Sequence, residues 1–469
     1  MALTDDPPQA SEYADRVIAV EPGGNEYIPA DARHGTPRQM FWTWTSPNLE
    51  FATIFIGVLS ATAFGMNFWQ AGLGLAIGVG LGAAAHYVLS ARGPEHGVPQ
   101  MVLGRLAFGY RGNALPAAFM SIMCGVGWFA TNSVSGAFAL STLTGMPKIL
   151  SLILIVVAQT GFAVFGHNLV HAFERFVFPV LAVVFLVVTV VILTKADLGA
   201  PAPSGGVGGM GGFLLTVGTA FGYAGGWNPY AADYTRYLPA TVSKVATGGY
   251  AAAGLFVSCL WLSALGAASA TIASTVEGSP TDVFTANLPS ALANPTLLAI
   301  TLGAVAANAL NVYSGAMAFV TIGLKLPIRT QRAVVSIGFG AVGFLVAWWA
   351  LPDAAASYEA FLLIVAYWIG PWLGVMFADQ YLRRGRRFDD LLYDRSYTNW
   401  GGVAAFLIGL VVSILLFSNQ AEFTGYVVRE LPDLGDITFF VGFASALVAY
   451  VLLARPRGID NEPTGALHG

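Results

Sequence analysis

The sequence predicts an all-α integral membrane protein with about twelve transmembrane helices. Of its 469 residues, 56% are hydrophobic and only 10% are charged, whereas a soluble domain carries roughly 25% charged residues. So few charges cannot cover a globule of this size with a surface compatible with water, although they can serve the loops of a bundle whose sides face lipid. Glycine is abundant, with 55 residues, which is typical of membrane helices that pack closely together.

Apolar stretches recur along the chain at lengths that can cross a bilayer, which takes about 20 residues in a helix. We place spans near residues 50–67, 69–91, 113–143, 148–166, 170–194, 211–236, 243–273, 291–323, 332–350, 356–381, 400–418 and 437–454. Residues 1–40 are polar and lack an apolar core, so we interpret them as a disordered cytoplasmic tail and not as a signal peptide. The membrane domain then covers residues 41–455, and residues 456–469 form a second cytoplasmic tail.

The basic residues predict the orientation of the bundle. With the N-terminus on the cytoplasmic side, 19 of the 22 Lys and Arg residues fall on cytoplasmic segments, and only Lys148, Lys195 and Arg429 fall outside. This excess is the positive-inside pattern, so we expect a multi-pass protein of the plasma (cell inner) membrane with both termini cytoplasmic. The net charge of −4 gives no indication of a nucleic-acid partner, and no obligate protein partner is evident.

Two spans contain residues that interrupt helices. The first span begins after Trp44–Glu50 (WTSPNLE), and the sixth contains Phe221–Tyr230 (FGYAGGWNPY). Two glycines, an asparagine and a proline at membrane depth cannot keep a continuous hydrogen-bond ladder, so the freed backbone groups must face protein or a water-filled cavity. Close helix packing is the alternative explanation for the glycines, but packing alone requires no proline. We therefore predict that the first and sixth helices are unwound, the sixth within residues 222–229.

The two interrupted spans are five helices apart. Irregular segments at matching positions of two five-helix halves are typical of secondary transporters with inverted repeats and a binding site near the bilayer midplane. We predict repeats at about residues 50–194 and 211–381, followed by extra helices at about 400–454. The alternative classes fit less well, because a membrane enzyme should show clustered His or carboxylates at one membrane face and a channel should show a repeated pore loop.

Polar residues at membrane depth are the candidates for a binding site. Trp128 and Asn132 share one face of the third span, and Asn308 and Asn311 share one face of the eighth. The side chains of either pair could instead pack between helices or form interhelical hydrogen bonds, without a role in binding. An indole beside an amide, however, suits a planar heterocycle with polar edges, because amides read base edges and aromatic rings stack on bases.

The charged residues of the spans have structural and functional interpretations. Glu50 would lie in the first turn of helix one, where a carboxylate suits the helix dipole, with Ser46 as N-cap and Pro47 as first residue. A proton-coupling role is the alternative. Asp233 and Arg236 end the sixth span and are interpreted as a surface or gate salt bridge.

Signatures of enzymes and metal sites are absent from the sequence. It contains no His-Glu-x-x-His, no Gly-x-Ser-x-Gly and no phosphate-binding loop. Cys124 and Cys259 both lie in apolar spans and form no disulfide framework. We expect no catalytic residue, no metal and no cofactor beyond a coupling ion.

Four segments carry a family resemblance. They are residues 93–105 (GPEHGVPQMVLGR), 127–132 (GWFATN), 228–237 (NPYAADYTRY) and 307–314 (ANALNVYS). In this order and on these spans they resemble the nucleobase–cation symporters, in particular the purine–cytosine permease branch, over residues 40 to 455. The resemblance implies a LeuT-type fold, with ten helices in two inverted repeats plus two more, and import of nucleobases or related compounds coupled to protons or sodium.

The resemblance also implies a substrate site, made of Trp128, Asn132, Trp227, Asn308, Asn311 and Thr53. The two indoles would cover the two faces of the base, and Asn132 and Asn311 would bind its edge with Asn308 as a neighbour. The alternative substrates on the same fold are an amino acid, whose carboxylate could meet the broken first helix, and a hydantoin- or allantoin-type compound.

The coupling ion is predicted from a departure from the family pattern. Sodium-coupled relatives bring hydroxyl residues of helix eight to a cation site, one or two turns before the asparagine that matches Asn311. Here that stretch is Gly303–Ala307 (GAVAA), and Thr301 lies too far along the helix. Because a hard cation prefers oxygen ligands, we expect protons rather than sodium, with Glu50 as the first candidate carrier and Asp233 as the second.

Overall fold

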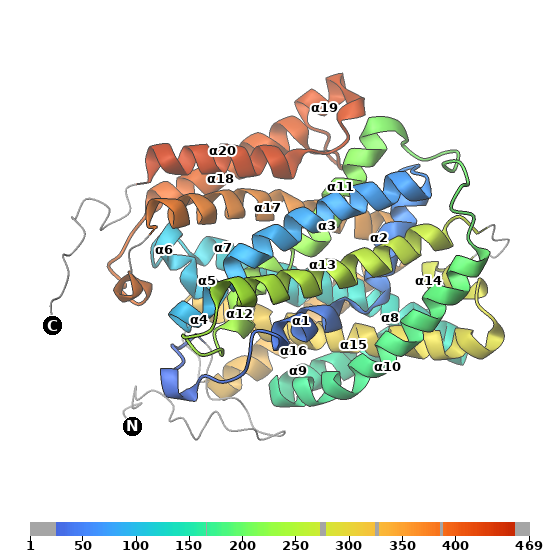
Figure 1. Ribbon diagram of the computed structural model, residues 1–469, viewed down its shortest axis with the longest axis horizontal. Coiled ribbons are helices and arrows are strands. Elements are labelled where there is room, and N and C mark those ends of the chain that lie inside the picture. The colour runs from blue at the N-terminus through green and yellow to red at the C-terminus, as the bar shows by residue number, and fades with distance from the viewer. Residues whose placement is uncertain (1–24, 166, 273–277, 324–327, 385–387, 455–469) are drawn as a thin grey trace.

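The computed structural model describes residues 25–165, 167–272, 278–323, 328–384 and 388–454, which form a bundle of helices (Figure 1). Its main helices are α1 (Gln39–Thr45), α2 (Phe51–Thr62), α3 (Phe68–Ser90), α7 (Ala114–Ile122), α8 (Phe129–Thr144), α9 (Lys148–Phe165), α10 (His167–Lys195), α11 (Gly209–Gly225), α12 (Ala231–Thr235), α13 (Lys244–Ser269), α15 (Ser290–Thr321), α16 (Ile328–Ala350), α17 (Ala354–Leu382), α18 (Trp400–Phe417) and α20 (Thr438–Leu453). The described ranges contain no strand, only two isolated bridges, so the all-α prediction is confirmed.

Short helices mark the two ends of the bundle. One end carries α4 (Gly93–His96), α5 (Gln100–Leu103) and α6 (Arg105–Phe108), at the left of Figure 1, and the other carries α14 (Pro280–Ala286), at the right. α19 (Tyr426–Glu430) lies at the top of Figure 1, beyond the right-hand ends of α18 and α20. We call the two ends the α4–α6 end and the α14 end.

Every predicted span coincides with a helix or with consecutive helical segments. Within the described residues, seven helical stretches are long and apolar enough to cross a membrane: Phe68–His96, Ala114–Thr144, Val177–Lys195, Lys244–Ser269, Ser290–Thr321, Val334–Leu382 and Trp400–Phe417. Phe51–Thr62, Lys148–Gly161 and Thr438–Leu453 are shorter apolar helices. The membrane character is thus clear, while the number of twelve crossings stays a prediction.

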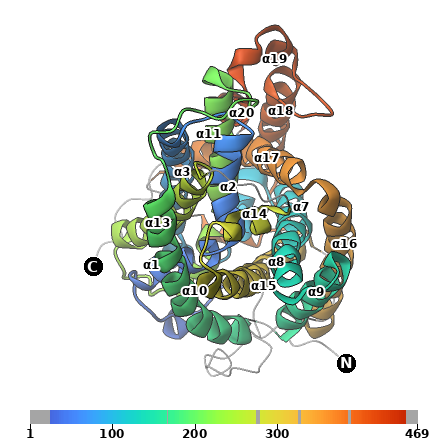
Figure 2. The same ribbon diagram turned by 90° about the vertical axis from the view of Figure 1, so that its right-hand side faces the viewer.

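The helices form two groups that meet at α2. In the first group α3 packs against α11 and α13, and α13 packs against α1 and α2; in the second, α15 packs against α8 and α9, which also contact α16. Figure 2 looks along the bundle, with α2 in its middle, α3 and α13 on one side, and α8, α9 and α16 on the other. α17 joins α11 to the outer pair α18 and α20.

Glycine allows the closest of these contacts, between α2 and α13. A Cβ atom on Gly57 would lie 1.7 Å from the Ser263 carbonyl oxygen, and one on Gly266 would lie 1.8 Å from the Ile54 carbonyl oxygen. Only glycine fits at either position, so the two backbones pack directly against each other, as small residues permit between membrane helices.

The N-terminal tail is shorter than predicted. Residues 1–24 lie outside the described residues, as do 455–469, but residues 25–40 pack against the α4–α6 end. Ile28 is buried and its amide donates to the Gly97 carbonyl at 2.9 Å, and the Arg33 guanidinium donates to the Pro94 carbonyl at 2.7 Å. Assigning residues 25–40 to a disordered tail was therefore wrong, because a few polar residues can be held by backbone carbonyls without an apolar run.

Candidate functional site

Helix one is interrupted, as predicted, but the break lies later than expected. After α1, residues Ser46–Asn48 form one 3₁₀ turn, Leu49 and Glu50 have non-helical backbone angles, and α2 begins at Phe51. Glu50 is the N-cap position of α2, and its side chain makes no capping hydrogen bond. Ser46 as N-cap and Pro47 as first residue was therefore wrong, since both belong to the 3₁₀ turn that follows α1.

Helix six is also interrupted within the predicted segment. α11 ends at Gly225, Gly226 and Trp227 form a turn, and Asn228–Tyr230 form a 3₁₀ turn before α12 begins. Proline at position 229 has no N–H to continue an α-helical ladder. The Trp227 indole nitrogen donates to Oδ1 of Asn48 at 2.9 Å, so the two breaks lie at the same level and are joined.

A π-helical turn in helix three carries Trp128. Residues Met123–Trp128 link α7 to α8 in this conformation, which often occurs at functional sites. The Trp128 ring meets Tyr223 and Phe361 edge-on, with centroids 5.3 Å and 4.9 Å apart. A Cβ atom on Gly226 would lie 3.2 Å from this indole, which places Trp128 against the break of helix six.

The three asparagines of the predicted site form one hydrogen-bonded network. Oδ1 of Asn308 accepts from the amide nitrogens of Asn132 at 3.0 Å and Asn311 at 3.3 Å, while its own nitrogen donates to the Phe129 carbonyl at 2.9 Å. Asn308 thus orients both of its neighbours. The Tyr230 hydroxyl donates to Oδ1 of Asn311 at 2.8 Å.

Asn132 differs from the other two amides of this network. Its Oδ1 is buried and has no partner among the described residues. A buried acceptor without a donor is costly, so this oxygen remains available to a polar ligand.

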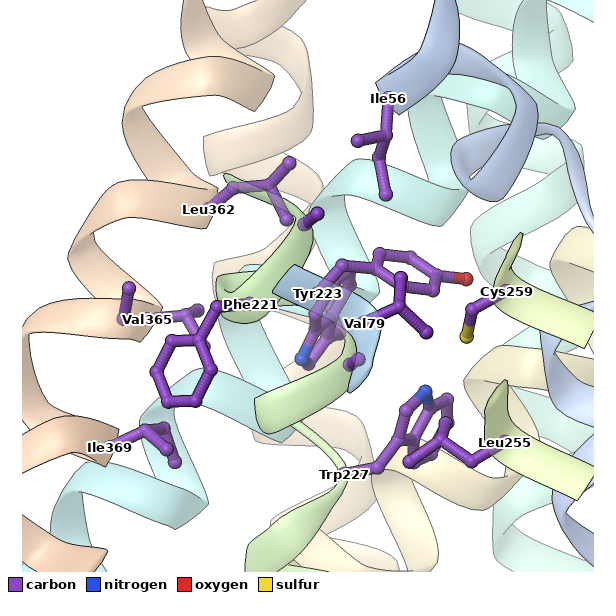
Figure 3. Packing of buried hydrophobic residues seen from close by; sticks show 14 of the residues in the cluster. Ile56, Val79, Phe221, Tyr223, Trp227, Leu255, Cys259, Leu362, Val365 and Ile369 are labelled. Atoms are coloured by element: carbon purple, nitrogen blue, oxygen red, sulfur yellow. The ribbon is translucent and has the colours of Figure 1, made fainter. Parts of the chain in front are cut away.

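Glu50 lies in a second polar group at the break of helix one. Its Oε1 accepts from the Tyr223 hydroxyl at 3.1 Å, and that hydroxyl lies 2.5 Å from Oγ1 of Thr53. Thr53 donates to the Asn48 carbonyl at 2.7 Å, so it closes the break and is already hydrogen-bonded. Figure 3 shows the Tyr223 ring reaching from α11 with its hydroxyl pointing toward α13, where Cys259 lies.

A glycine of helix eight, Gly303, lies against the polar group around Glu50. A Cβ atom on Gly303 would lie 2.9 Å from the Leu49 carbonyl oxygen and 3.5 Å from the Glu50 Cβ. The stretch that the sequence analysis compared with a cation site therefore faces the break of helix one, and it brings no side-chain oxygen there.

Asp233 is not part of a surface salt bridge. Asp233 and Arg236 are each 1% exposed, so the surface interpretation was wrong. Oδ1 of Asp233 accepts from the Gln100 backbone amide at 3.0 Å, which joins the end of helix six to the segment 93–105 at the α4–α6 end.

A cavity of about 940 Å³ opens at the α14 end. Its walls come from α2, α8, α16, α17 and the loop before α19, and they are mostly apolar, with aromatic rings from Phe51, Phe55, Phe138, Trp349, Tyr358, Phe361 and Phe423. Gly127 and Thr131 of helix three line it, whereas the neighbouring Trp128 and Asn132 are buried. The cavity thus reaches the helix that carries the candidate site, and Trp227 takes no part in its lining.

The structure thus brings together two helices that are interrupted at the same level. Beside the two breaks lie buried amides from helices three and eight and the indole of Trp128 from helix three. Sequence reasoning missed Asn48, Tyr223 and Tyr230 as hydrogen-bonding members of this arrangement. All three stood in segments already singled out, but only the fold connects Tyr223 to Glu50. Such a pair of interrupted helices at a polar midplane site is characteristic of secondary transporters.

Comparison with known proteins identifies the family within this class. The family described as "permease for cytosine/purines, uracil, thiamine, allantoin" matches residues 27–442, and the chain belongs to it. The family resemblance and the prediction of a membrane transporter rather than an enzyme are therefore confirmed.

Individual relatives agree over most of their length. The Bacillus subtilis protein YxlA, a provisionally named purine-cytosine permease, is 28% identical over 92% of this chain and 95% of its own. Purine-cytosine permease fcyB of Emericella nidulans is 27% identical over 94% and 89%. Purine-cytosine permease FCY2 of Saccharomyces cerevisiae is 25% identical over 88% and 81%.

Solved structures agree in fold. The inward-facing conformation of Mhp1 matches with a TM-score of 0.72 at 20% identity over 92% of both chains. Mhp1, a nucleobase-cation-symport-1 family transporter, matches in a closed conformation with bromovinylhydantoin bound, with a TM-score of 0.71 at 19% identity over 92% of this chain and 94% of that one. The predicted LeuT-type fold is confirmed.

Proposed function

We propose that this protein imports a nucleobase, or a related planar heterocycle of the cytosine or purine type, by symport with protons. The orientation proposed with it places the α4–α6 end in the cytoplasm and the α14 end outside the plasma membrane, in accord with the basic residues of the sequence. The observation that carries the substrate class is the unpartnered Oδ1 of Asn132 within the amide network beside Trp128.

The chemistry of this group suits a flat ligand with polar edges. A ring N–H or amino group of a base can donate to Oδ1 of Asn132, while Asn308 holds the Asn132 and Asn311 amides in orientation. Trp128 supplies an aromatic surface at the break of helix six, and stacking a base on such a ring contributes about 1–3 kcal/mol. The relatives named as purine-cytosine permeases support the same class.

The coupling ion is argued from the break of helix one. A hard cation prefers several oxygen ligands, and helix eight faces this break with Gly303, Val305 and Ala306 nearby in its sequence. What the break does hold is the carboxyl of Glu50, hydrogen-bonded to Tyr223 with its second oxygen unpartnered. A buried carboxyl at membrane depth is a natural proton carrier. Asp233 is the second candidate.

A second substrate class remains in the proposal as the alternative. Hydantoin- and allantoin-type rings present the same alternation of N–H and C=O groups as a base edge, and the closed Mhp1 structure contains bromovinylhydantoin. Amino acids are the other alternative, and they would use the backbone N–H groups at the start of α2.

Competition for uptake tests the proposal. The protein, reconstituted into lipid vesicles, would take up radiolabelled cytosine in the presence of an excess of hypoxanthine, allantoin, hydantoin or individual amino acids, with imposed pH or sodium gradients. We expect cytosine or a purine to compete best and the pH gradient to drive uptake. Uptake that only amino acids inhibit would reject the substrate class, and uptake that needs sodium and ignores an uncoupler would reject proton coupling.

A further inference from the structure

Three buried polar side chains lie beside the two breaks and take no part in the site described above. They are Trp44 in α1, His86 in α3 and Asn228 in the 3₁₀ turn after α11, which we call the His86 cluster. Their exposures are 1%, 0% and 0%. Both ring nitrogens of His86, both amide atoms of Asn228 and the indole nitrogen of Trp44 are buried without a hydrogen-bond partner among the described residues.

The members of the cluster are in contact. The rings of Trp44 and His86 meet edge-on, with centroids 4.2 Å apart and planes at 78°. The Asn228 side chain lies beside the imidazole, without a hydrogen bond of ordinary geometry between them. The cluster therefore joins α3 to residues on both interrupted helices.

The cluster is also connected to the proposed substrate site. The Trp44 and Trp227 rings meet with centroids 5.8 Å apart. The Trp44 carbonyl accepts from the Asn48 amide at 2.7 Å, and Asn48 in turn accepts from the Trp227 indole. On the other side, toward the α4–α6 end, the Ser90 hydroxyl lies one helical turn beyond His86 and is likewise buried and unpartnered.

Packing alone does not account for these side chains. Nearly all buried polar groups in proteins have a partner, and an exception points to a bound water or to a functional role. Apolar rings would fill the same space without leaving donors and acceptors unsatisfied. A buried water needs two to four polar partners, and the three side chains of the cluster have five polar atoms without a partner among the described residues. A histidine at membrane depth is, in addition, a residue type found on proton routes.

The charges around the imidazole leave it as the group suited to carry a proton. α3 packs against α2, α11, α12, α13 and the 3₁₀ turn after α11, whose titratable side chains are Tyr223, Tyr230, Asp233, Tyr234, Lys244, Tyr250 and Cys259. Lys244 is exposed and pairs with Glu95 at 2.7 Å, and Asp233 accepts from the Gln100 amide. A solvated imidazole exchanges a proton near neutral pH, and water bound at its ring nitrogens would favour the protonated form that burial alone disfavours.

We propose that the His86 cluster binds water and relays the coupling proton from the break of helix one to the α4–α6 end. This relay rests on the proton symport proposed above. A water that has taken the proton from the Glu50 carboxyl gives it to the free ring nitrogen of neutral His86. The imidazolium then releases a proton to water when the α4–α6 end opens, and the imidazole returns to its neutral form. Asn228 and Trp44 hold the water that makes both transfers.

The test uses the full chain in lipid vesicles, as wild type, His86→Gln and Tyr87→Phe. Glutamine keeps a polar side chain but cannot carry a proton. Tyr87 is the matched control, because it neighbours His86 but lies half-buried against Gly248 of α13, outside the cluster. Two rates are measured with radiolabelled cytosine: net uptake driven by an imposed pH gradient, and exchange of internal for external cytosine at equal pH. Exchange requires no net release of protons.

We expect His86→Gln to lower pH-driven net uptake by about a hundredfold or more, which is the contribution of a positioned proton carrier. Its exchange rate, and both rates of Tyr87→Phe, should stay close to those of the wild type. Net uptake at the wild-type rate would overturn the relay, and so would an equal loss of both rates, which a purely structural histidine would give. His86→Asn, read by the same two rates, serves if the glutamine variant does not reach the folded state. If uptake by the wild type depends on a sodium gradient and not on the pH gradient, the proposed proton symport is itself rejected, whatever the variants show.

Discussion

The breaks in helices one and six occupy matching positions in the two repeats but are built from different chemistry. At the break of helix one, side chains satisfy the freed backbone: Thr53 donates to the Asn48 carbonyl, and Asn48 donates to that of Trp44. At the break of helix six, glycine and proline end the helix, and the Asn228 side chain has no hydrogen-bond partner within the described part of the chain. Helix one therefore brings the Glu50 carboxyl to the centre, whereas helix six brings aromatic side chains whose polar atoms donate hydrogen bonds to helices one and eight.

This difference shows that the two halves of an inverted repeat can share a backbone conformation and still supply different side-chain chemistry. Both halves use the same backbone device, because each must expose polar groups at membrane depth without exposing them to lipid. The amides that we propose to bind the base edge come from neither break but from α8 and α15, in the other group of helices. The proposed proton carrier, ring contacts and edge contacts thus lie on separate elements, so each of them can be tested by itself.

The largest effect is expected at the break of helix one. Glu50→Gln keeps the hydrogen bond to Tyr223 but removes the proton carrier, so uptake driven by a pH gradient should fall by about a hundredfold or more, while exchange persists. Radiolabelled uptake in vesicles measures both rates. Glu359→Gln is the control, since Glu359 is a half-buried carboxyl of α17 outside the Glu50 group. Accumulation of substrate by Glu50→Gln against a gradient would assign the proton to another residue, with Asp233 next to be examined.

The next effect concerns the helices outside the breaks. Asn132→Ala removes the available acceptor and leaves a donor of the ligand unpaired, while Asn308 keeps its hydrogen bond from Asn311. The expected cost is about 1–3 kcal/mol, or roughly ten- to more than hundredfold in affinity. Binding of cytosine by the purified variant measures the loss. Gln159→Leu provides a control, because it removes a buried amide that joins α9 to Ser133 and the Ala304 carbonyl. Equal losses in both variants would mean that Asn132 acts as a link between helices and does not bind substrate.

An effect of the same order is expected for the ring that rests on the break of helix six. Trp128→Ala should weaken binding by about 1–3 kcal/mol if a base stacks on the indole, whereas Trp128→Phe retains part of the surface and should lose less. The comparison of the two dissociation constants is the measurement. Equal weakening by Phe and Ala would indicate that the full indole is needed to pack Tyr223 and Phe361 rather than to stack on the substrate.

The sequence predicts some of these features and not others, for physical reasons. The break of helix six follows from Gly225, Gly226 and Pro229, because local backbone chemistry determines it. The shared face of Asn308 and Asn311 follows from helical periodicity. The orienting role of Asn308, in contrast, depends on the Phe129 carbonyl, 179 positions away in sequence, and no local pattern encodes such a contact.

Two further misses have the same origin. The π turn at Met123–Trp128 lies inside an unbroken apolar run, where periodicity indicates an ordinary helix, and only the glycine-rich sequence Cys124–Gly127 hints at it. His86 stands in an otherwise apolar span, so the sequence shows a histidine at membrane depth. Its meaning depends on Trp44 and Asn228, which the fold brings to it.

The smallest effect separates the two glycines at the break of helix six. Gly226 has φ −56°, so alanine fits the backbone, but its Cβ would lie 3.0 Å from the Gly222 carbonyl oxygen and 3.2 Å from the Trp128 ring. At Gly225 the nearest atoms lie 3.3 Å away, on the Phe221 ring. Gly225 is the last residue of α11 and Gly226 has right-handed helical backbone angles, so neither alanine strains the backbone. The difference between Gly226→Ala and Gly225→Ala therefore reports the crowding at Trp128. Because overpacking costs about 1–3 kcal/mol, we expect cytosine affinity to fall by about tenfold in Gly226→Ala and to stay closer to the wild type in Gly225→Ala. Equal affinities in the two variants would show that Trp128 can move away from the break without loss, and that helix six contributes a flexible joint rather than a fixed wall.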